Sequence, residues 1–216
     1  MRSTLGLACV VAAGVLLFPG SARAQGHFGL HAYAIVDLDA LTAKRSFEAV
    51  LGTSQLKAFG GGAEVADVWK HLFVRVAVTR AQEKGSRGFV SGSEFFPNGI
   101  ALTMTMTPLE AGAGWRFVSK KGSRLTPYGG VSFLSVGYTE TSTFADAADN
   151  VSESFKGQAV FGGVEIGVAK GLTITAEAQY RRVPNAIGAG GVSKDFNETD
   201  LGGVTARITI GFRTKR

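Results

Sequence analysis

Apolar and polar residues alternate strictly between Leu172 and Arg182. The even positions are apolar, from Leu172 to Tyr180, and the odd positions are polar, from Thr173 to Arg181. This period of two predicts a β-strand with one apolar and one polar face. About ten residues is also the length that a strand needs to cross a membrane. The apolar face could contact lipid while the charged face lines a lumen, but one strand alone is equally compatible with a soluble barrel.

Comparable patterns along the chain predict eight strands. Gly60-Gly61-Gly62 predicts a bend or bulge in the second strand. In the fourth strand the apolar positions change from even to odd at Pro108, which predicts a bulge that resets the phase. The fifth strand is less regular, with Leu134, Val136 and Tyr138 on one face and Val131 and Phe133 on the other. The expected strands are Phe28–Leu38, Leu56–Trp69, His71–Arg80, Gly99–Val118, Tyr128–Glu140, Phe155–Ala169, Leu172–Arg182 and Leu201–Arg213.

The connections between these strands alternate in length. The first is long and contains Leu41–Gly52, which has the pattern of a short amphipathic helix, whereas the second is only Trp69–His71. The later long connections are Ala81–Asn98, Thr141–Ser154 and Val183–Asp200, and the shorter ones are Ser119–Pro127 and Ala169–Gly171. Outer-membrane barrels alternate short periplasmic turns with long outer loops. An even number of strands then places both termini on the periplasmic side.

The N-terminus has the pattern of a secretory signal peptide. Arg2 precedes an uncharged run from Leu5 to Phe18, and Ala22-Arg23-Ala24 provides an Ala-x-Ala cleavage site. We expect cleavage after Ala24, which divides the chain into a signal peptide, 1–24, and one barrel domain, 25–216. The alternative, a transmembrane helix, needs about 20 apolar residues, and this run is shorter.

Composition excludes several classes of protein. Removal of residues 1–24 lowers Lys plus Arg from 23 to 21 against 17 acids, a net charge of +4 that does not indicate nucleic-acid binding. The single cysteine, Cys9, lies in the signal peptide, so the mature chain has no disulfide. His27, His31 and His71 are dispersed, and no metal site or cofactor is expected. High glycine, 30 residues, with little proline, 5 residues, suits a tightly curved sheet.

With these features the chain resembles the small outer-membrane β-barrel proteins of the OmpA-like and OmpX-like porin superfamily. The resemblance rests on the signal peptide, on Trp115-Arg116-Phe117 and Tyr180-Arg181-Arg182 at strand ends, and on the final Ile208–Phe212. It implies an all-β, eight-stranded, antiparallel, up-and-down transmembrane barrel in the outer membrane of a Gram-negative bacterium. It also implies a monomer that contacts outer-membrane lipids and the outer-membrane assembly machinery. Family members usually end on an aromatic residue, whereas here Phe212 is followed by four more residues.

Two sets of side chains are expected to have distinct roles. Aromatic residues near strand ends would form girdles at the membrane interfaces, the alternative being core packing in a soluble barrel. These are Trp69, Trp115, Phe117, Tyr128, Tyr138, Tyr180 and Phe212. Charged residues on the opposite faces would form a network in the lumen: Glu64, Arg75, Glu110, Arg116, Glu165, Glu177, Arg181 and Arg207.

The charged set has two interpretations. In a narrow eight-stranded barrel the charges pair across the interior and close it, whereas in a wider pore they form a selectivity ring. Closure is the expectation, and Glu177 with Arg207, on neighbouring strands, is the pair we expect to meet first. The chain is therefore predicted to have a structural or surface-interaction role through its long outer loops.

Three alternatives remain open on the sequence alone. One is a narrow porin-like channel for small solutes or ions. Another is a lipid-modifying enzyme, for which His31 is the only candidate catalytic residue, since no nucleophile elbow or paired-carboxylate motif is present. The last is a soluble lipocalin-like barrel that binds an apolar ligand. No catalytic residue is assigned, and no extracellular partner is indicated.

Overall fold

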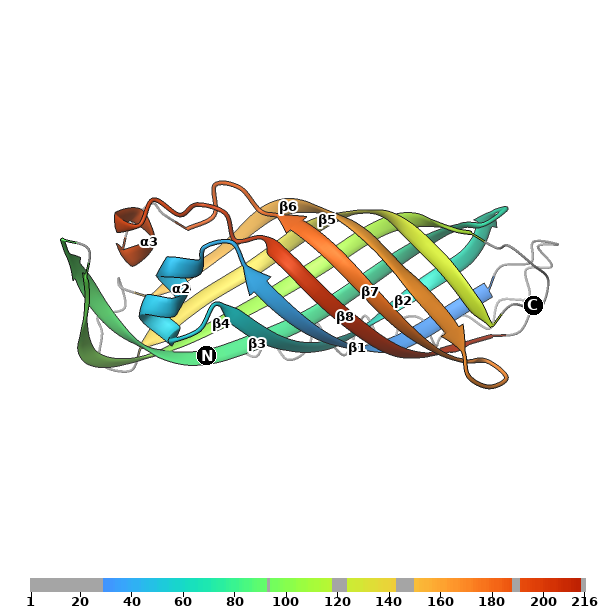
Figure 1. Ribbon diagram of the computed structural model, residues 1–216, viewed down its shortest axis with the longest axis horizontal. Helices are drawn as coiled ribbons and strands as arrows, with labels where there is room; N and C mark the ends of the chain where they lie inside the picture. Colours follow the sequence, from blue (N-terminus) through green and yellow to red (C-terminus); the bar gives the residue numbers. More distant parts are fainter. Residues whose placement is uncertain (1–28, 93, 118–123, 143–149, 188–190, 215–216) are drawn as a thin grey trace.

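Strand β7 (Leu172–Arg182) alternates between the two sides of a barrel wall, as its sequence predicts. The computed structural model describes residues 29–92, 94–117, 124–142, 150–187 and 191–214. Each strand pairs antiparallel with the next, and β1 closes the barrel against β8 (Figure 1). The predicted eight-stranded up-and-down barrel is thus confirmed. The other elements are β1 (Gly29–Leu41), α2 (Lys44–Leu51), β2 (Gln55–Trp69), β3 (Leu72–Ser91), β4 (Glu94–Arg116), β5 (Leu125–Ser142), β6 (Val151–Gly167), α3 (Gly191–Asp195) and β8 (Gly203–Arg213).

The two ends of the barrel differ. One end, which we call the helix end, carries α2 and α3, while the other, the turn end, carries the shorter connections between β2 and β3, β4 and β5, and β6 and β7 (Figure 1). The first and last described strands meet at the turn end, where the Thr214 amide donates a 2.9 Å hydrogen bond to the Leu30 carbonyl. The predicted cleavage site at Ala24 and the strand position Phe28 lie outside the described residues. No helix among the described residues is long and apolar enough to cross a membrane.

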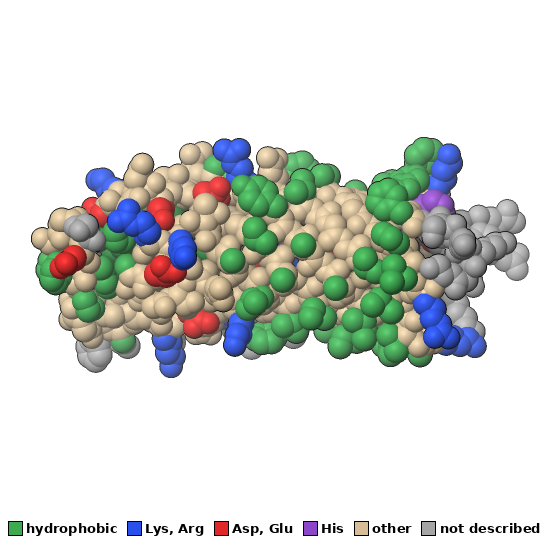
Figure 2. Space-filling view, in the orientation of Figure 1, with side chains coloured by type: hydrophobic (Ala, Val, Ile, Leu, Met, Phe, Trp, Pro, Cys, Tyr) green, Lys and Arg blue, Asp and Glu red, His purple; other side chains and the backbone are tan. Residues whose placement is uncertain are grey.

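A continuous apolar belt covers the outside of the barrel nearer the turn end. Its limit toward the helix end is a ring of eight outward side chains, one from each strand, that are 42–76% exposed. On β8 the belt runs from Val204 to Phe212, close to the length needed to cross a bilayer. Figure 2 shows hydrophobic side chains over this part of the molecule, acidic side chains toward the helix end, and basic side chains at both ends. The ring consists of Leu38, Phe59, Val78, Leu109, Phe133, Val160, Tyr180 and Val204.

Apolar residues change sides at the edge of this belt. In β4, Leu109 faces outward and is exposed, whereas Met104 and Met106 face inward and are buried. The strand itself keeps its alternation, because even positions point inward on both sides of Pro108. The same reversal explains the irregular fifth strand, in which Phe133 faces outward and Leu134 faces inward. Apolar side chains therefore point outward, toward lipid, within the belt and point inward, into the core, beyond it.

The predicted bulge at Pro108 is wrong. Leu109 pairs with Val78 and Met106 pairs with Ala81, which is the same register, and the ladder to β5 runs unbroken through Pro108. For Gly60-Gly61-Gly62 a bend or bulge was predicted, and a bulge is absent, since that ladder is regular. The register of β2 against β3 instead shifts between Val65 and Trp69, where Asp67 has a positive φ of 57°. The change of apolar positions from even to odd at Pro108 therefore reflects a change in the surroundings of the strand, not a bulge in its backbone.

The prediction that Ala81–Asn98 forms a loop is wrong. Strands β3 and β4 continue past the belt and pair as a long hairpin, down to Ser91 opposite Glu94. The sequence of this hairpin shows only weak apolar alternation, because neither of its faces contacts lipid beyond the belt. The hairpin was therefore not recognised from the sequence. In Figure 1 this hairpin projects beyond α2 and α3 at the helix end. The strands β5 and β6 likewise extend into the connection predicted at Thr141–Ser154, so four strands form a sheet beyond the belt.

An apolar core fills the inside of the barrel at the helix end. Helix α2, expected within Leu41–Gly52, packs Phe47 edge-on against Tyr138 with ring centroids 6.5 Å apart. Val183, Ala186 and Leu201, from the connection between β7 and β8, are buried in the same core. Glu198 from that connection accepts hydrogen bonds from the Ser46 amide and hydroxyl, both 2.7 Å, and so caps α2. Two connections that are distant in sequence are therefore joined over the barrel mouth.

Candidate functional site: a closed, charged lumen

Within the belt, the barrel interior is lined by charged side chains. All eight positions predicted for the lumen network lie inside and are buried, each 6% exposed or less. The set is larger than predicted, because Asp37 and Asp39 of β1 and Arg213 of β8 also take part in ion pairs there. Together these are six carboxylates and five guanidinium groups. In the sequence, Asp37 and Asp39 alternate with the apolar Val36 and Leu38, and this alternation is the signal that could have included them.

Arg75 forms the centre of the network. Its guanidinium lies 2.5 Å from a Glu177 oxygen and 2.6 Å from a Glu110 oxygen, so it pairs with two carboxylates from different strands. It also lies 3.5 Å above the centre of the Phe161 ring. A planar guanidinium suits this arrangement, since it donates several hydrogen bonds at its edge while its face stacks on an aromatic ring.

A second chain of ion pairs joins β1 to β7 and β8. Arg207 contacts Asp37 at 2.8 Å and Glu110 at 3.0 Å. Arg181 contacts Asp37 at 3.1 Å and Asp39 at 2.9 Å. Because Asp37 and Glu110 are each shared by two arginines, the groups form one connected network. Such sharing compensates for the cost of removing each charge from water, which unpaired would be several kcal/mol per ion.

A third group lies nearer the turn end. Arg116 contacts Glu64 at 2.6 Å and Glu165 at 3.2 Å, and Arg213 also pairs with Glu165. The Nε2 atom of His31 lies 2.9 Å from the Thr173 hydroxyl. His31 is only 3% exposed and faces the lumen, so it does not reach the lipid side of the wall. The described residues contain no cluster suited to a metal ion.

Aromatic rings fill the space between these charged groups. Phe73, Tyr128 and Phe161 form a buried cluster, and the Arg116 guanidinium lies 4.5 Å from the Phe73 ring centre. The rings fit because glycines lie directly opposite them on the neighbouring strand, as Gly114 does for Phe73 and Gly62 for Tyr33. A Cβ at Gly114 would lie 2.4 Å from the Phe73 ring, and one at Gly62 would lie 2.6 Å from the Tyr33 ring. The high glycine content therefore provides room for side chains inside the barrel.

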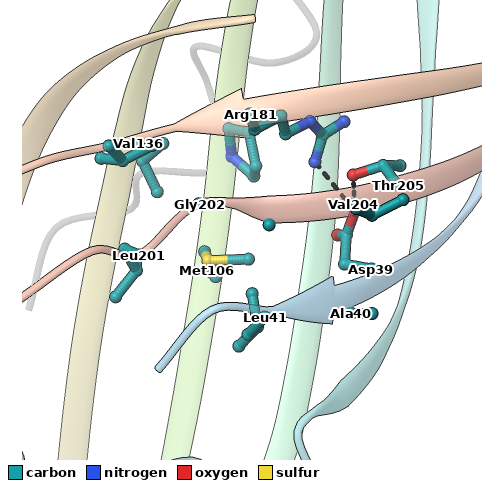
Figure 3. Close-up of a pocket in the computed structure, with 13 residues that line it drawn as sticks. Asp39, Ala40, Leu41, Met106, Val136, Arg181, Leu201, Gly202, Val204 and Thr205 are labelled. Atoms are coloured by element: carbon teal, nitrogen blue, oxygen red, sulfur yellow. Dashed lines mark hydrogen bonds and ion pairs between the residues drawn. The ribbon is translucent and has the colours of Figure 1, made fainter. Parts of the chain in front are cut away.

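Two small cavities lie among these described side chains. One, of about 20 Å³, is bordered by His31, Arg75, Arg116 and Tyr128, among others. The other, of about 10 Å³, lies where the charged lumen meets the apolar core, with Asp39 and Arg181 on one side and Met106 on the other (Figure 3). A cavity needs about 10–15 Å³ to hold a single water molecule. The described interior is packed, and these cavities are too small for a solute.

The predicted aromatic girdle is partly wrong. Trp69, Phe117, Tyr180 and Phe212 face outward with 55–61% exposure, and Trp115 packs beside Trp69 with ring centroids 6.1 Å apart. Tyr128 and Tyr138, by contrast, point inward and are 8% and 4% exposed. Tyr128 belongs to the lumen aromatic cluster and Tyr138 to the apolar core. Because Val131 and Phe133 face outward, strict alternation along the strand puts the even positions Tyr128 and Tyr138 on the inner face. This reasoning would have placed both correctly.

The tip of the β3–β4 hairpin carries a feature that the sequence did not reveal. Phe89 and Phe96 pair across the strands, and their rings stack at 5.6 Å with an interplanar angle of 21°. They are 61% and 42% exposed, and they lie far beyond the belt. We call this pair the hairpin tip. The segment was predicted as a loop, so its cross-strand pairing could not be anticipated.

The sequence matches no protein-family model and no curated protein sequence. The fold, in contrast, is similar to that of solved outer-membrane barrels. Outer membrane protein OprG from Pseudomonas aeruginosa gives a TM-score of 0.55 at 13% identity, covering 88% of this chain and 96% of OprG. Neisserial surface protein A gives 0.51 at 14% identity, covering 88% and 97%. A major outer membrane protein from Thermus thermophilus gives 0.50 at 11% identity, covering 87% and 100%.

Identities this low relate the proteins by fold alone. The match nevertheless spans nearly the whole of each solved barrel, and the described strands of this chain close in the same way. The resemblance drawn from the sequence is thereby confirmed at the level of the fold: the chain has the architecture of the small outer-membrane β-barrels.

Proposed function

We propose that this chain is a non-conducting outer-membrane barrel whose role is surface interaction through its helix end. Membrane residence is supported by the belt, where large apolar side chains on every strand are exposed. A soluble lipocalin-like barrel has the reverse arrangement, with polar residues outside and an apolar lumen. The outside of this barrel, at belt level, suits only a non-aqueous surrounding.

The observation that carries the proposal is that the same barrel has a packed lumen and an extended, exposed hairpin tip. Ion pairs and aromatic rings occupy the interior of the belt, and the apolar core under α2 occupies the helix end. The alternative of a narrow porin-like channel would need a hydrated path through both. The alternative of a lipid-modifying enzyme is not supported, because His31 lies inside the wall beside Thr173.

The hairpin tip is the surface best suited to contact another molecule. Aromatic residues are enriched at protein interfaces, and an exposed stacked pair offers a rigid apolar contact. Phe89 and Phe96 need no exposure for the stability of the barrel, since they lie beyond both the belt and the apolar core.

Two measurements on the same protein test the proposal. In planar bilayers, the purified wild type should show no steady conductance. Whole cells displaying the wild type should attach to octyl-coated beads more than cells displaying Phe89→Ser/Phe96→Ser. Ser154→Ala, an exposed change on β6, is the control and should attach like the wild type. Steady conductance would favour the channel, and equal attachment by all three would contradict the role of the tip.

A further inference from the structure

We propose that outward-facing basic residues just beyond the belt, on β2 and β3, bind the phosphate groups of lipids in the surrounding leaflet. The inference rests on the proposed membrane residence. It concerns the collar, which we define as the outward-facing positions within the strands, up to three on each, that lie beyond the belt toward the helix end; β8 begins at the belt and supplies none. The collar lies at the level where lipid headgroups meet water.

The collar carries charge of one sign. Five of its side chains are basic and exposed, and no described collar position carries a carboxylate. The interior at the same level is the apolar core, where Ala81 and Met106 are buried. The collar cations are therefore separate from the charged network of the lumen, which lies at belt level. The basic residues are Lys57, Arg80, Lys84, Lys156 and Arg182.

Three of these cations converge on one part of the wall. Arg80 lies directly opposite Phe59 in the β2–β3 ladder, and Ala58 opposite Ala81, so Lys57 falls diagonally between Arg80 and Lys84. Diagonal neighbours on one face of a sheet are about 7–8 Å apart, within reach of long side chains. None of the three takes part in an ion pair among the described residues.

The neighbouring strand supplies hydroxyl groups. On β4 the collar positions are Thr103, Thr105 and Thr107, and Thr103 pairs directly with Lys84. Cations together with hydroxyl donors suit a phosphate, which accepts several hydrogen bonds at once. Carboxylates, which would repel it, are not among these collar positions.

The belt below the cluster identifies the ligand as a lipid. Phe59 and Val78 stand immediately under the cations and are 62% and 42% exposed. A lipid bound at this site would therefore contact the apolar belt side chains with its acyl chains and the collar cations with its phosphate headgroup. A free phosphate would contact only the cations. Clusters of Lys and Arg at a membrane surface bind anionic headgroups in this way.

The experiment uses purified, folded protein in detergent, with diphosphoryl lipid A as probe and native mass spectrometry to count retained lipid. Lys57→Gln/Lys84→Gln should weaken retention by about 25-fold, taking about fivefold for each cation. Lys44→Gln/Lys194→Gln removes the same charge outside the collar and should retain the lipid like the wild type. Adding Arg80→Gln to the collar variant should abolish retention.

Two further arms identify what is bound. The same lipid without its phosphates should be retained weakly by every variant, and inorganic phosphate should not displace lipid A. Equal loss in the collar and control variants would overturn the proposal, as would strong retention of the dephosphorylated lipid or displacement by inorganic phosphate. The assay involves neither the lumen nor the hairpin tip, so its failure would leave the proposed function standing; bilayer conductance tests the lumen and attachment to octyl-coated beads tests the hairpin tip.

Discussion

Glu177 and Arg207 lie directly opposite each other on β7 and β8, yet each has its shortest ion pair with another residue. Their closest charged atoms are 3.8 Å apart, whereas Glu177 lies 2.5 Å from Arg75 and Arg207 lies 2.8 Å from Asp37. Strand adjacency correctly predicted the contact. It did not predict the closer partners: Arg75 reaches Glu177 from β3 across the lumen, and Asp37 lies opposite Arg207 only because β1 closes the barrel against β8.

This geometry predicts which pair is most strongly coupled. Arg75→Ala should lower the free energy of unfolding by about 3–5 kcal/mol, because it leaves two buried carboxylates without their main partner. The Arg75→Ala/Glu177→Ala double variant should lose less than the sum of the single changes. Urea titrations of protein folded in lipid vesicles would measure the double-mutant cycles of Arg75 with Glu177 and of Arg207 with Glu177. A larger coupling for Arg207 with Glu177 than for Arg75 with Glu177 would contradict the arrangement.

The sequence predicted the barrel well because lipid imposes a strict alternation on every strand. That alternation identified the inward charges Glu64, Arg75 and Arg116 without any knowledge of register. It failed where the environment changed, as at Pro108 and Tyr138, because an apolar residue points toward lipid in the belt and toward a core beyond it. The contacts of Arg75 with Glu177 and Phe161 depend on which strands face each other across a closed barrel, and no local pattern contains that information.

The belt predicts where an added charge is costly. Ile208→Arg should lower the free energy of unfolding by about 2–4 kcal/mol if the site lies near the bilayer midplane. Thr139→Arg, which also faces outward but lies beyond the belt, should change it by less than about 0.5 kcal/mol. Titrations into vesicles would show whether the two costs differ. Similar values would mean that the belt does not contact lipid.

Thr209→Arg is a less suitable control than alternation alone suggests. Thr209 faces the lumen, where an added charge would be expected to cost less than on the lipid face. In the structure its hydroxyl lies 2.6 Å from that of Thr175, and the adjoining cavity holds only about 20 Å³. An arginine does not fit there, so we expect Thr209→Arg to destabilise the barrel as well.

Glycines on the lumen face should be intolerant of side chains. A Cβ at Gly114 would lie 2.4 Å from the Phe73 ring and 2.7 Å from the Gly129 carbonyl oxygen. Gly114→Ala should therefore lower the free energy of unfolding by about 1–3 kcal/mol through overpacking. At Gly162, on the outer face, the nearest atom would be 3.7 Å away, and Gly162→Ala is the matched control. Equal stability of the two variants would show that the lumen is less densely packed.

The Glu198 cap should hold α2 over the barrel mouth. Glu198→Ala removes the acceptor for the Ser46 amide and hydroxyl, and loss of a helix cap costs about 0.5–2 kcal/mol. We expect faster hydrogen exchange in α2 while the belt strands exchange as in the wild type. Glu48→Ala, on the helix itself, is the control and leaves this cap in place. Unchanged exchange in α2 would mean that Phe47 and the apolar core hold the helix without the cap.

The direction of the barrel in the membrane is the last relationship that can be tested directly. Ser91 ends β3 beside the hairpin tip, and Lys170 lies at the turn end. The chain has only one native cysteine, Cys9. If the helix end faces outward, Ser91→Cys should react with an impermeant thiol reagent on intact cells. Lys170→Cys should react only after the outer membrane is broken. The positions Asp146 and Gly190 would serve the same purpose by sequence, but they lie outside the described residues. Labelling of Lys170→Cys on intact cells, with Ser91→Cys protected, would reverse the orientation and place the hairpin tip in the periplasm.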